Sequence, residues 1–252
     1  KNTVDNLDFV KFSDEQEKKL RRIYQHNRTR ADMLRLRANV WLNDTIINDW
    51  FLCLQHRSTD DLFMPTNFAD LLTTTDLEHK KGKGRKKDYW WKRVIKLRAT
   101  SETASHNRIF IMINAKKLHW VLAVVYVPQQ KVVVYDSCNL ESHKEIKKKC
   151  NAIMLWVKKF KGGEWDFDYK NNTPEQLNDC DCGVFVCMTA DFGADQATPD
   201  NIDWIEYDRD DISQFRKRIA CRLQEGINSL YREEHDEAQD PLPEETWTLP
   251  ES

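Results

Sequence analysis

Cys182 stands at the centre of the chemically most informative stretch of the chain. It is followed by Gly183 and then by an apolar run that predicts a buried helix. A cysteine at a helix N-terminus meets unpaired backbone N–H groups and the helix dipole, which favour the thiolate, the form that attacks carbonyl carbon. Gly183 would let a substrate backbone approach closely. Gln176, six residues before Cys182, offers a side-chain N–H to a developing oxyanion. The pattern predicts acyl transfer by a nucleophilic thiol.

A nucleophilic thiol needs a base, and the base needs an orienting group. Two β-branched runs at residues 118–125 and 132–137 predict a hairpin. His119 lies at the start of the first strand and Asp136 near the end of the second, so antiparallel pairing would make them neighbours. The carboxylate would then fix the tautomer of the imidazole and stabilise the imidazolium. We expect His119, Asp136 and Cys182 to form a catalytic triad.

Each of these residues also has an ordinary structural interpretation. His119 alone fits a core histidine at a strand end, Asp136 a turn, and Cys182 a buried helix cysteine. These interpretations are independent of one another, whereas the catalytic one explains all three residues and Gln176 together. Cys180 is the rival nucleophile because an aspartate also precedes it, but only Cys182 is followed by glycine and an apolar helix. A disulfide between the two thiols under oxidation is a further hypothesis.

The order of these residues resembles that of the ubiquitin-like-protein proteases, the SUMO-specific cysteine proteases. The resemblance is carried by four motifs: Trp41-Leu42-Asn43-Asp44, His119-Trp120, Tyr135-Asp136-Ser137, and Gln176 followed by Asp181-Cys182-Gly183-Val184. The motifs span residues 40–190, and flanking helices extend the likeness over 10–232. The resemblance implies an α+β, papain-like cysteine protease fold, a small mixed sheet flanked by helices.

The same resemblance implies a set of substrate-binding residues. Trp41 and Trp120 would form the lid and floor of a narrow channel that admits only a Gly-Gly tail, although a tryptophan also simply fills core. Gly183 would lie beside that channel. Asp44 would contact a basic residue of the modifier, or stabilise the first turn of its helix through the dipole.

The hydrophobic pattern predicts the elements around the motifs. We expect strands at 108–114, 119–127, 131–135 and 164–169, and helices at 13–27, 46–54, 67–73, 88–98, 143–160, 182–193 and 211–231. Helices on either side of a small sheet are typical of an α+β domain. We expect one catalytic domain over residues 1–232 and an acidic, flexible tail over 233–252.

Composition narrows the possible functions. The 252 residues carry a net charge of −2, which implies no global attraction to nucleic acid or to a membrane surface. The longest apolar run, 120–127, is too short to span a bilayer. The basic cluster Lys80–Lys87 has three interpretations, in order of preference: a solvated loop, a surface for an acidic modifier or target, and a nuclear-localisation or nucleic-acid patch. The chain begins at Lys1, so we suspect a catalytic fragment.

The odd number and scattered positions of the cysteines predict that the protein works in a reducing compartment. None of the seven has the C-x-x-C spacing of a structural zinc site. We expect Cys53, Cys150, Cys187 and Cys221 to be small core hydrophobes. No metal or organic cofactor is expected. The predicted protein is an intracellular monomer, nuclear or cytoplasmic, without membrane contact.

The predicted function is that of a cysteine isopeptidase and endopeptidase that cleaves after the C-terminal Gly-Gly of a ubiquitin-like modifier. SUMO is the first choice because segment 41–44 most resembles that branch. The alternatives on the same fold are a deubiquitinase, a deneddylase, and an acyltransferase with another acceptor. The alternative from a different class is an inactive module that binds the modifier without cleaving it. A zinc or nucleic-acid module is disfavoured by the cysteine spacing and the net charge.

Overall fold

The computed structural model describes residues 29–74, 106–115, 118–170, 174–195 and 209–236. Two predicted helices (13–27 and 88–98), the basic cluster Lys80–Lys87 and residues 237–252 lie outside these ranges. In chain order the described elements are α2 (Arg30–Met33), the 3₁₀ helix η2 (Leu34–Leu36), α3 (Asp44–Arg57), β1 (Asp61–Phe63), α4 (Phe68–Thr74), β2 (Arg108–Ala115), β3 (His119–Tyr126), β4 (Lys131–Tyr135), α7 (Lys144–Lys161), β5 (Asp166–Lys170), α8 (Cys182–Asp195) and α9 (Arg209–Asp236).

The five strands form one mixed sheet in the order β1-β2-β3-β4-β5. The two central pairings, β2 with β3 and β3 with β4, are antiparallel, and the two outer pairings are parallel. The predicted hairpin is confirmed, with Leu122 opposite Tyr135 and Tyr126 opposite Lys131. Strand β1 was not predicted, because three residues are too few to show an alternating pattern.

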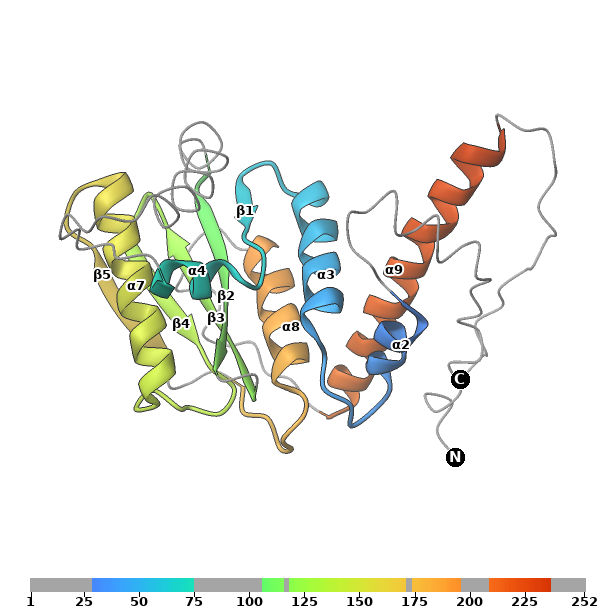
Figure 1. The fold of residues 1–252 in the computed structure, drawn as a ribbon, viewed down its shortest axis with the longest axis horizontal. Helices are drawn as coiled ribbons and strands as arrows, with labels where there is room; N and C mark the ends of the chain where they lie inside the picture. Colours follow the sequence, from blue (N-terminus) through green and yellow to red (C-terminus); the bar gives the residue numbers. More distant parts are fainter. Residues whose placement is uncertain (1–28, 75–105, 116–117, 171–173, 196–208, 237–252) are drawn as a thin grey trace.

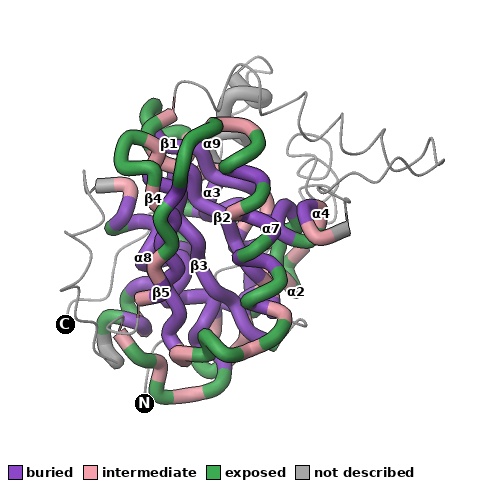
Figure 2. Tube along the Cα trace, turned by 90° about the vertical axis from the view of Figure 1, so that its left-hand side faces the viewer, coloured by how far each residue is buried: buried purple, intermediate pink, exposed green. Residues whose placement is uncertain are grey.

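Helices cover both faces of the sheet (Figure 1). Helices α4 and α7 lie on one face, α3 and α8 lie on the other, and α9 packs outside them. Strand β3 is buried along its whole length, as the purple tube shows (Figure 2). Its residues alternate between the two cores, with Trp120, Leu122 and Val124 toward α3 and α8, and Val121, Ala123 and Val125 toward α4 and α7. Burial on both faces explains why its sequence is a continuous apolar run.

Helix α8, which begins at Cys182, is held between the sheet and two other helices. The Trp50 indole N–H, on α3, donates to the Cys187 carbonyl of α8 at 3.3 Å. The Trp50 ring meets Phe215 of α9 edge-on, with ring centroids 5.4 Å apart. Burying an aromatic or aliphatic side chain of this size contributes about 1.5–3 kcal/mol. Packing on all sides therefore fixes where the first turn of α8 lies.

The last helix is longer than predicted. Helix α9 runs from Arg209 to Asp236, so it includes residues 233–236 of the segment expected to be a tail. Its apolar residues Ile212, Phe215 and Ile219 are buried, as the hydrophobic pattern of a helix at 211–231 requires. Among the described residues, every helix is too short or too polar to cross a membrane.

The four cysteines expected in the core fall into three environments. Cys150 and Cys187 are buried, and burial raises the pKa of both thiols, that of Cys150 to about 12. Cys53 is half-buried. The prediction is wrong for Cys221, which is exposed because it lies on the outer side of α9. All seven cysteines are free thiols.

Candidate active site

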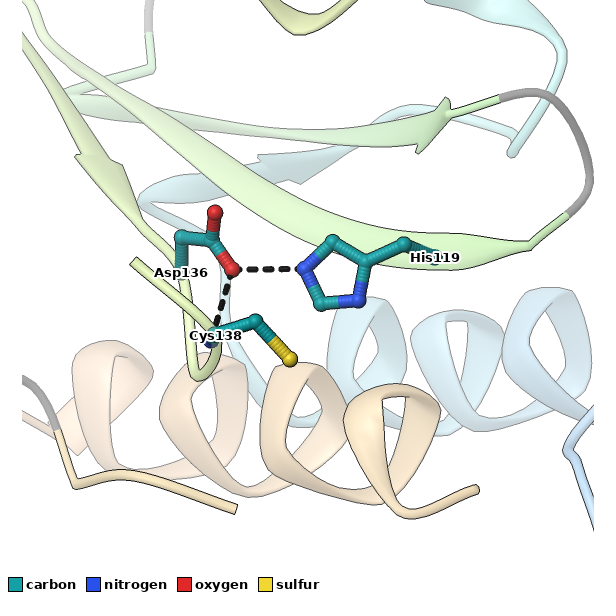
Figure 3. Close-up of side chains that lie close together, drawn as sticks. All are labelled: His119, Asp136 and Cys138. Carbon is teal, nitrogen blue, oxygen red and sulfur yellow. Dashed lines mark hydrogen bonds and ion pairs between the residues drawn. The ribbon is translucent and has the colours of Figure 1, made fainter. Parts of the chain in front are cut away.

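A buried imidazole–carboxylate pair lies where strands β3 and β4 diverge. His119 is the first residue of β3, and Asp136 follows the last residue of β4. The His119 Nε2 atom lies 2.6 Å from Asp136 Oδ1 (Figure 3), and the two residues are 7 % and 1 % exposed. The predicted neighbourhood of His119 and Asp136 is therefore present.

The Asp136 carboxylate has partners on both oxygens. Oδ1 also accepts the Cys138 backbone N–H at 2.9 Å, while Oδ2 accepts the Leu140 backbone N–H at 2.8 Å and the Tyr169 hydroxyl at 2.5 Å. Burial alone would raise the pKa of Asp136, but the hydrogen bonds from His119, Tyr169 and the Cys138 backbone lower it below 3.8. The carboxylate is thus ionised and held in one orientation.

The His119 imidazole sits between this carboxylate and two thiols. Burial by itself would lower the pKa of His119, but its hydrogen bonds with Asp136, Cys138 and Cys182 raise it from 6.5 to about 11. The protonated ring is the form that an anionic carboxylate on one side stabilises. An imidazolium in this place can in turn stabilise a thiolate and later donate its proton to a leaving group.

Cys182 is placed at the start of α8 by the residue before it. The Asp181 carbonyl accepts the backbone N–H groups of Val184 at 2.8 Å and Phe185 at 3.0 Å, so the helix begins at Cys182. Cys180 lies before this helix, and its thiol donates to Asn178 Oδ1 at 3.4 Å. Burial raises the pKa of the Cys180 thiol. Only Cys182 combines the helix start with contact to the imidazole.

Gln176 is held beside the site by a small polar network. Its backbone N–H donates to the Ser137 carbonyl at 3.0 Å, and its side-chain Oε1 accepts the Ser137 hydroxyl at 2.8 Å. Its Nε2 donates to the Asn178 carbonyl at 2.5 Å. This bond commits one of the two amide N–H groups and orients the amide, and the oxyanion role predicted for Gln176 rests on the other.

Gly183 has a structural role inside the protein, and the substrate-binding role expected for it stays a prediction. A Cβ atom there would lie 3.0 Å from Leu42 Cβ and 3.3 Å from Trp120 Cδ1. The space beside Gly183 is thus filled by the protein's own side chains, which lets α8 approach the segment before α3. The Trp120 indole N–H donates to the Leu42 carbonyl at 3.1 Å, so the buried Trp120 joins that segment to β3 next to the nucleophile helix.

The remaining two predicted substrate residues lie on the outer side of the same segment. Trp41 is half-buried, and Asp44 is the exposed first residue of α3. Asn43 caps α3, because its Oδ1 atom accepts the Ile46 backbone N–H at 3.2 Å. The exposed carboxylate of Asp44 lies in the first helical turn, so its position suits both contact with a partner and interaction with the helix dipole.

Arg216 was not singled out from the sequence, although it connects three parts of the site. It is 2 % exposed, and all five of its N–H donors have acceptors. Two reach Asp181 Oδ1, and three reach the carbonyls of Arg35 (3.1 Å), Arg37 (3.1 Å) and Val40 (2.9 Å). One guanidinium therefore joins the residue before the nucleophile to the segment that leads to Trp41.

The sequence contained a partial signal for Arg216. It lies four residues after Ile212 and three before Ile219, on the apolar face of α9. A charged residue on an apolar face needs a buried partner. The partners themselves could not be named, because the three carbonyls lie on a segment more than 170 positions earlier.

Cys138 and Tyr169 were also missed. The donor atoms of His119, Asp136 and Cys138 all lie within 4.8 Å of one another (Figure 3). Extending the β3–β4 register beyond its last pair, Leu122 with Tyr135, would put position 138 opposite position 119, which is a signal available in the sequence. Tyr169 reaches Asp136 from β5, where it pairs with Val134. That parallel register has no local sequence signal.

A buried carboxylate–imidazole pair, in contact with a thiol at the start of a buried helix, has the geometry of a thiol hydrolase. The mixed sheet flanked by helices makes it one of the α+β, papain-like kind. The chain belongs to the Ulp1 protease family, whose C-terminal catalytic domain matches residues 40–230.

Known relatives agree with this assignment. The sentrin-specific protease of Caenorhabditis elegans is 26% identical over 201 residues, covering 77% of this chain and 26% of the relative. Ubiquitin-like-specific protease 1 of Saccharomyces cerevisiae is 26% identical over 196 residues, covering 76% and 28%. The chain thus spans about a quarter of the length of these relatives. The C-terminal Ulp1 protease domain, solved in complex with Smt3, the yeast ortholog of SUMO, shares the fold with a TM-score of 0.61 at 19% identity, over 86% of this chain and 97% of that one.

Proposed function

We propose that the chain is a thiol isopeptidase and endopeptidase that cleaves after the C-terminal glycine of a ubiquitin-like modifier, with SUMO as the preferred modifier. The observation that carries the proposal is the contact of one buried imidazole with both Asp136 and Cys182 in a member of the Ulp1 protease family. The relatives named as sentrin-specific and the solved complex with Smt3 support SUMO over other modifiers.

The proposed reaction begins with attack of the Cys182 thiolate on the carbonyl carbon of the terminal glycine. The tetrahedral oxyanion is stabilised by the Cys182 backbone N–H, at a helix start, and by the Gln176 amide, each contributing about 3–4 kcal/mol as in comparable sites. His119 donates its proton to the leaving amine and then takes one from the water that hydrolyses the thioester. Asp136 orients the ring throughout.

The segment before α3 supplies the proposed selectivity. Trp120 lies against Leu42 and Gly183 at the nucleophile helix, and the half-buried Trp41 precedes Leu42 on the outside. Indole walls there would admit a tail of glycines, which have no side chains. Asp44, exposed at the first turn of α3, is the proposed contact for a basic residue of the modifier.

The free state of all seven cysteines supports action in a reducing compartment, the nucleus or the cytoplasm. We place the enzyme there as a monomer that engages modifier conjugates directly.

Activity-based probes test the proposal. The protein is incubated with SUMO, ubiquitin and NEDD8, each carrying a C-terminal electrophile, and labelling is followed as a shift in mass. We expect rapid labelling by the SUMO probe and none in the Cys182→Ala variant. Cys187→Ala, which removes a buried thiol one turn further along α8, should still be labelled. Labelling of the Cys182→Ala variant would refute the nucleophile, and preferential labelling by ubiquitin or NEDD8 would refute the modifier.

A further inference from the structure

Ser137 follows Asp136 at the end of β4 and binds the side chain on which the proposed oxyanion site rests. Its hydroxyl donates to Gln176 Oε1 at 2.8 Å, and its carbonyl accepts the Gln176 backbone N–H at 3.0 Å. Ser137 is only 6 % exposed, so its hydroxyl has little access to water. Two adjacent residues therefore contact two different groups of the site, since Asp136 binds the base and Ser137 binds the glutamine.

The Gln176 side chain depends on such contacts for its orientation. Gln176 lies outside any helix or strand, so regular backbone structure does not fix the direction of its amide. The amide has two N–H donors and one acceptor oxygen. Its Nε2 donates to the Asn178 carbonyl, which can only accept, and its Oε1 accepts the Ser137 hydroxyl. The two bonds hold the amide from both ends and determine where its second N–H points.

A second side-chain contact joins the same two segments without touching the Gln176 amide. Asn139 Nδ2 donates to Glu175 Oε1 at 2.7 Å, in an exposed position where water competes for both groups. This contact and the backbone bond from Gln176 to Ser137 can hold the segments together. The Ser137 hydroxyl is therefore not needed to bring the segments together, and its particular effect is on the direction of the Gln176 amide.

We propose that Ser137 is a positioning residue whose hydroxyl orients the Gln176 amide so that its second N–H faces the developing oxyanion. Without this bond the amide can rotate about its last side-chain torsion, which is a soft one, and turn its oxygen toward the negative charge. An oxygen in that place would repel the oxyanion that an N–H stabilises. The effect on the rate rests on the proposed function, whereas the effect on the orientation of the amide does not.

A double-mutant cycle on a fluorogenic SUMO substrate tests the effect on the rate. We expect Ser137→Ala to lower kcat about tenfold, the size of effect that one neutral hydrogen bond gives, with KM little changed because the oxyanion forms only in the transition state. In the Gln176→Ala background the same substitution should have no further effect. Thr66→Val is the matched control, because Thr66 is also 6 % exposed and its hydroxyl accepts from the amide of Asn48, so it should keep the parental kcat. An equal loss from Ser137→Ala in both backgrounds would overturn the inference.

NMR relaxation of the Gln176 side-chain amide tests the orientation without any need for activity. The resonance is assigned in protein with ¹⁵N-labelled glutamine by its loss in Gln176→Ala. We expect its order parameter to fall in Ser137→Ala, to be restored in Ser137→Thr, which keeps the hydroxyl, and to be unchanged in Glu175→Ala, which removes the neighbouring contact. An unchanged order parameter in Ser137→Ala would overturn the inference, while absence of hydrolysis in every sample would refute only the proposed function.

Discussion

Two buried aspartates flank the nucleophile, and their partners differ in kind. Asp136 faces His119, a group that gains and loses a proton near neutral pH in water. Asp181 faces Arg216, whose guanidinium keeps its charge at every physiological pH. The first pair can take part in proton transfer, whereas the second can only hold atoms in place. The site thus separates its proton chemistry from its positioning, on either side of Cys182.

The surroundings of the two carboxylates reinforce the difference. Asp136 receives a hydroxyl and two backbone N–H groups in addition to the imidazole, all from nearby strands and loops. Arg216 extends from Asp181 to three carbonyls of the segment that leads to Trp41. Damage to the first pair should therefore appear mainly in the rate, and damage to the second mainly in the stability of the fold.

The largest effect is expected from Asp136→Asn. The amide keeps the shape of the side chain but disfavours the imidazolium, and in comparable triads the same change lowers kcat about 10⁴-fold. We expect a loss of about 10³–10⁴-fold in kcat, with the thermal midpoint of unfolding changed only modestly, measured on a fluorogenic SUMO substrate. Asp168→Asn, on β5 and paired with Lys131, should keep the parental rate. A loss below tenfold in Asp136→Asn would contradict the role given to this carboxylate.

The next effect is on stability, from Arg216→Met. Removing one member of a buried ion pair leaves Asp181 and three carbonyls without their donor, which typically costs about 3–5 kcal/mol. The free energy of unfolding in urea measures this loss. Arg218→Met, two residues along α9, removes a guanidinium that is 57 % exposed and pairs with Asp191, so it should cost less than about 1 kcal/mol. An equal loss of unfolding free energy in Arg216→Met and Arg218→Met would contradict the special role given to the buried guanidinium of Arg216.

The pH dependence of stability tests the Asp136–His119 pair, whose two members titrate. The pKa of Asp136 is lowered from 3.8, so its stabilising contribution is complete above that pH and is lost as the pH falls through the folded-state value. The pKa of His119 is raised from 6.5 to about 11, so its contribution is complete below pH 6.5 and declines as the pH rises toward 11. The difference in unfolding free energy between the parent and Asp136→Asn should therefore be greatest between pH 3.8 and 6.5. A difference that is constant from pH 3 to 9 would contradict this coupling.

The smallest expected effect is that of Tyr169→Phe. Loss of a hydroxyl that donates to the ionised carboxylate raises the pKa of Asp136, so the acidic limb of the rate profile should move to higher pH. One such hydrogen bond is worth about 1.5–3 kcal/mol when its partner is charged, which sets the upper limit of the shift. Tyr126→Phe removes a buried hydroxyl that lies 3.1 Å from the Tyr135 hydroxyl, and should leave the limb in place. A shift of the same size in both variants would make Tyr169 merely structural.

Contacts between residues close in the sequence could be predicted, whereas contacts between residues far apart in the sequence could not. The hairpin that joins His119 to Asp136 is local, so its two apolar strands and short turn were sufficient to predict the pair. Cys138 was within reach of the same reasoning but was missed, because strand pairing ends at Tyr135 and a search for paired cysteines along the chain ignores a thiol brought in across a turn.

Other contacts had no local signal. Tyr169 arrives through a parallel pairing of β4 with β5, whose register depends on the intervening helix α7. Arg216 depends on carbonyls of an early segment, and carbonyl positions are a property of backbone conformation and not of residue type. The packing of Gly183 against Leu42 and Trp120 could not be predicted, because nothing in the sequence indicates that these two side chains lie beside it.

The reach of Arg216 also bears on how the protein is made. Synthesis delivers the nucleophile, the base and the segment before α3 well ahead of this arginine, since all of them precede it in the chain. The guanidinium of Arg216, on α9, is therefore made after the groups that it binds. Those groups are Asp181 and the carbonyls of Arg35, Arg37 and Val40. The contacts that hold the residue before Cys182 to the segment before α3 can therefore form only after α9 has left the ribosome, so this part of the fold is completed last during synthesis.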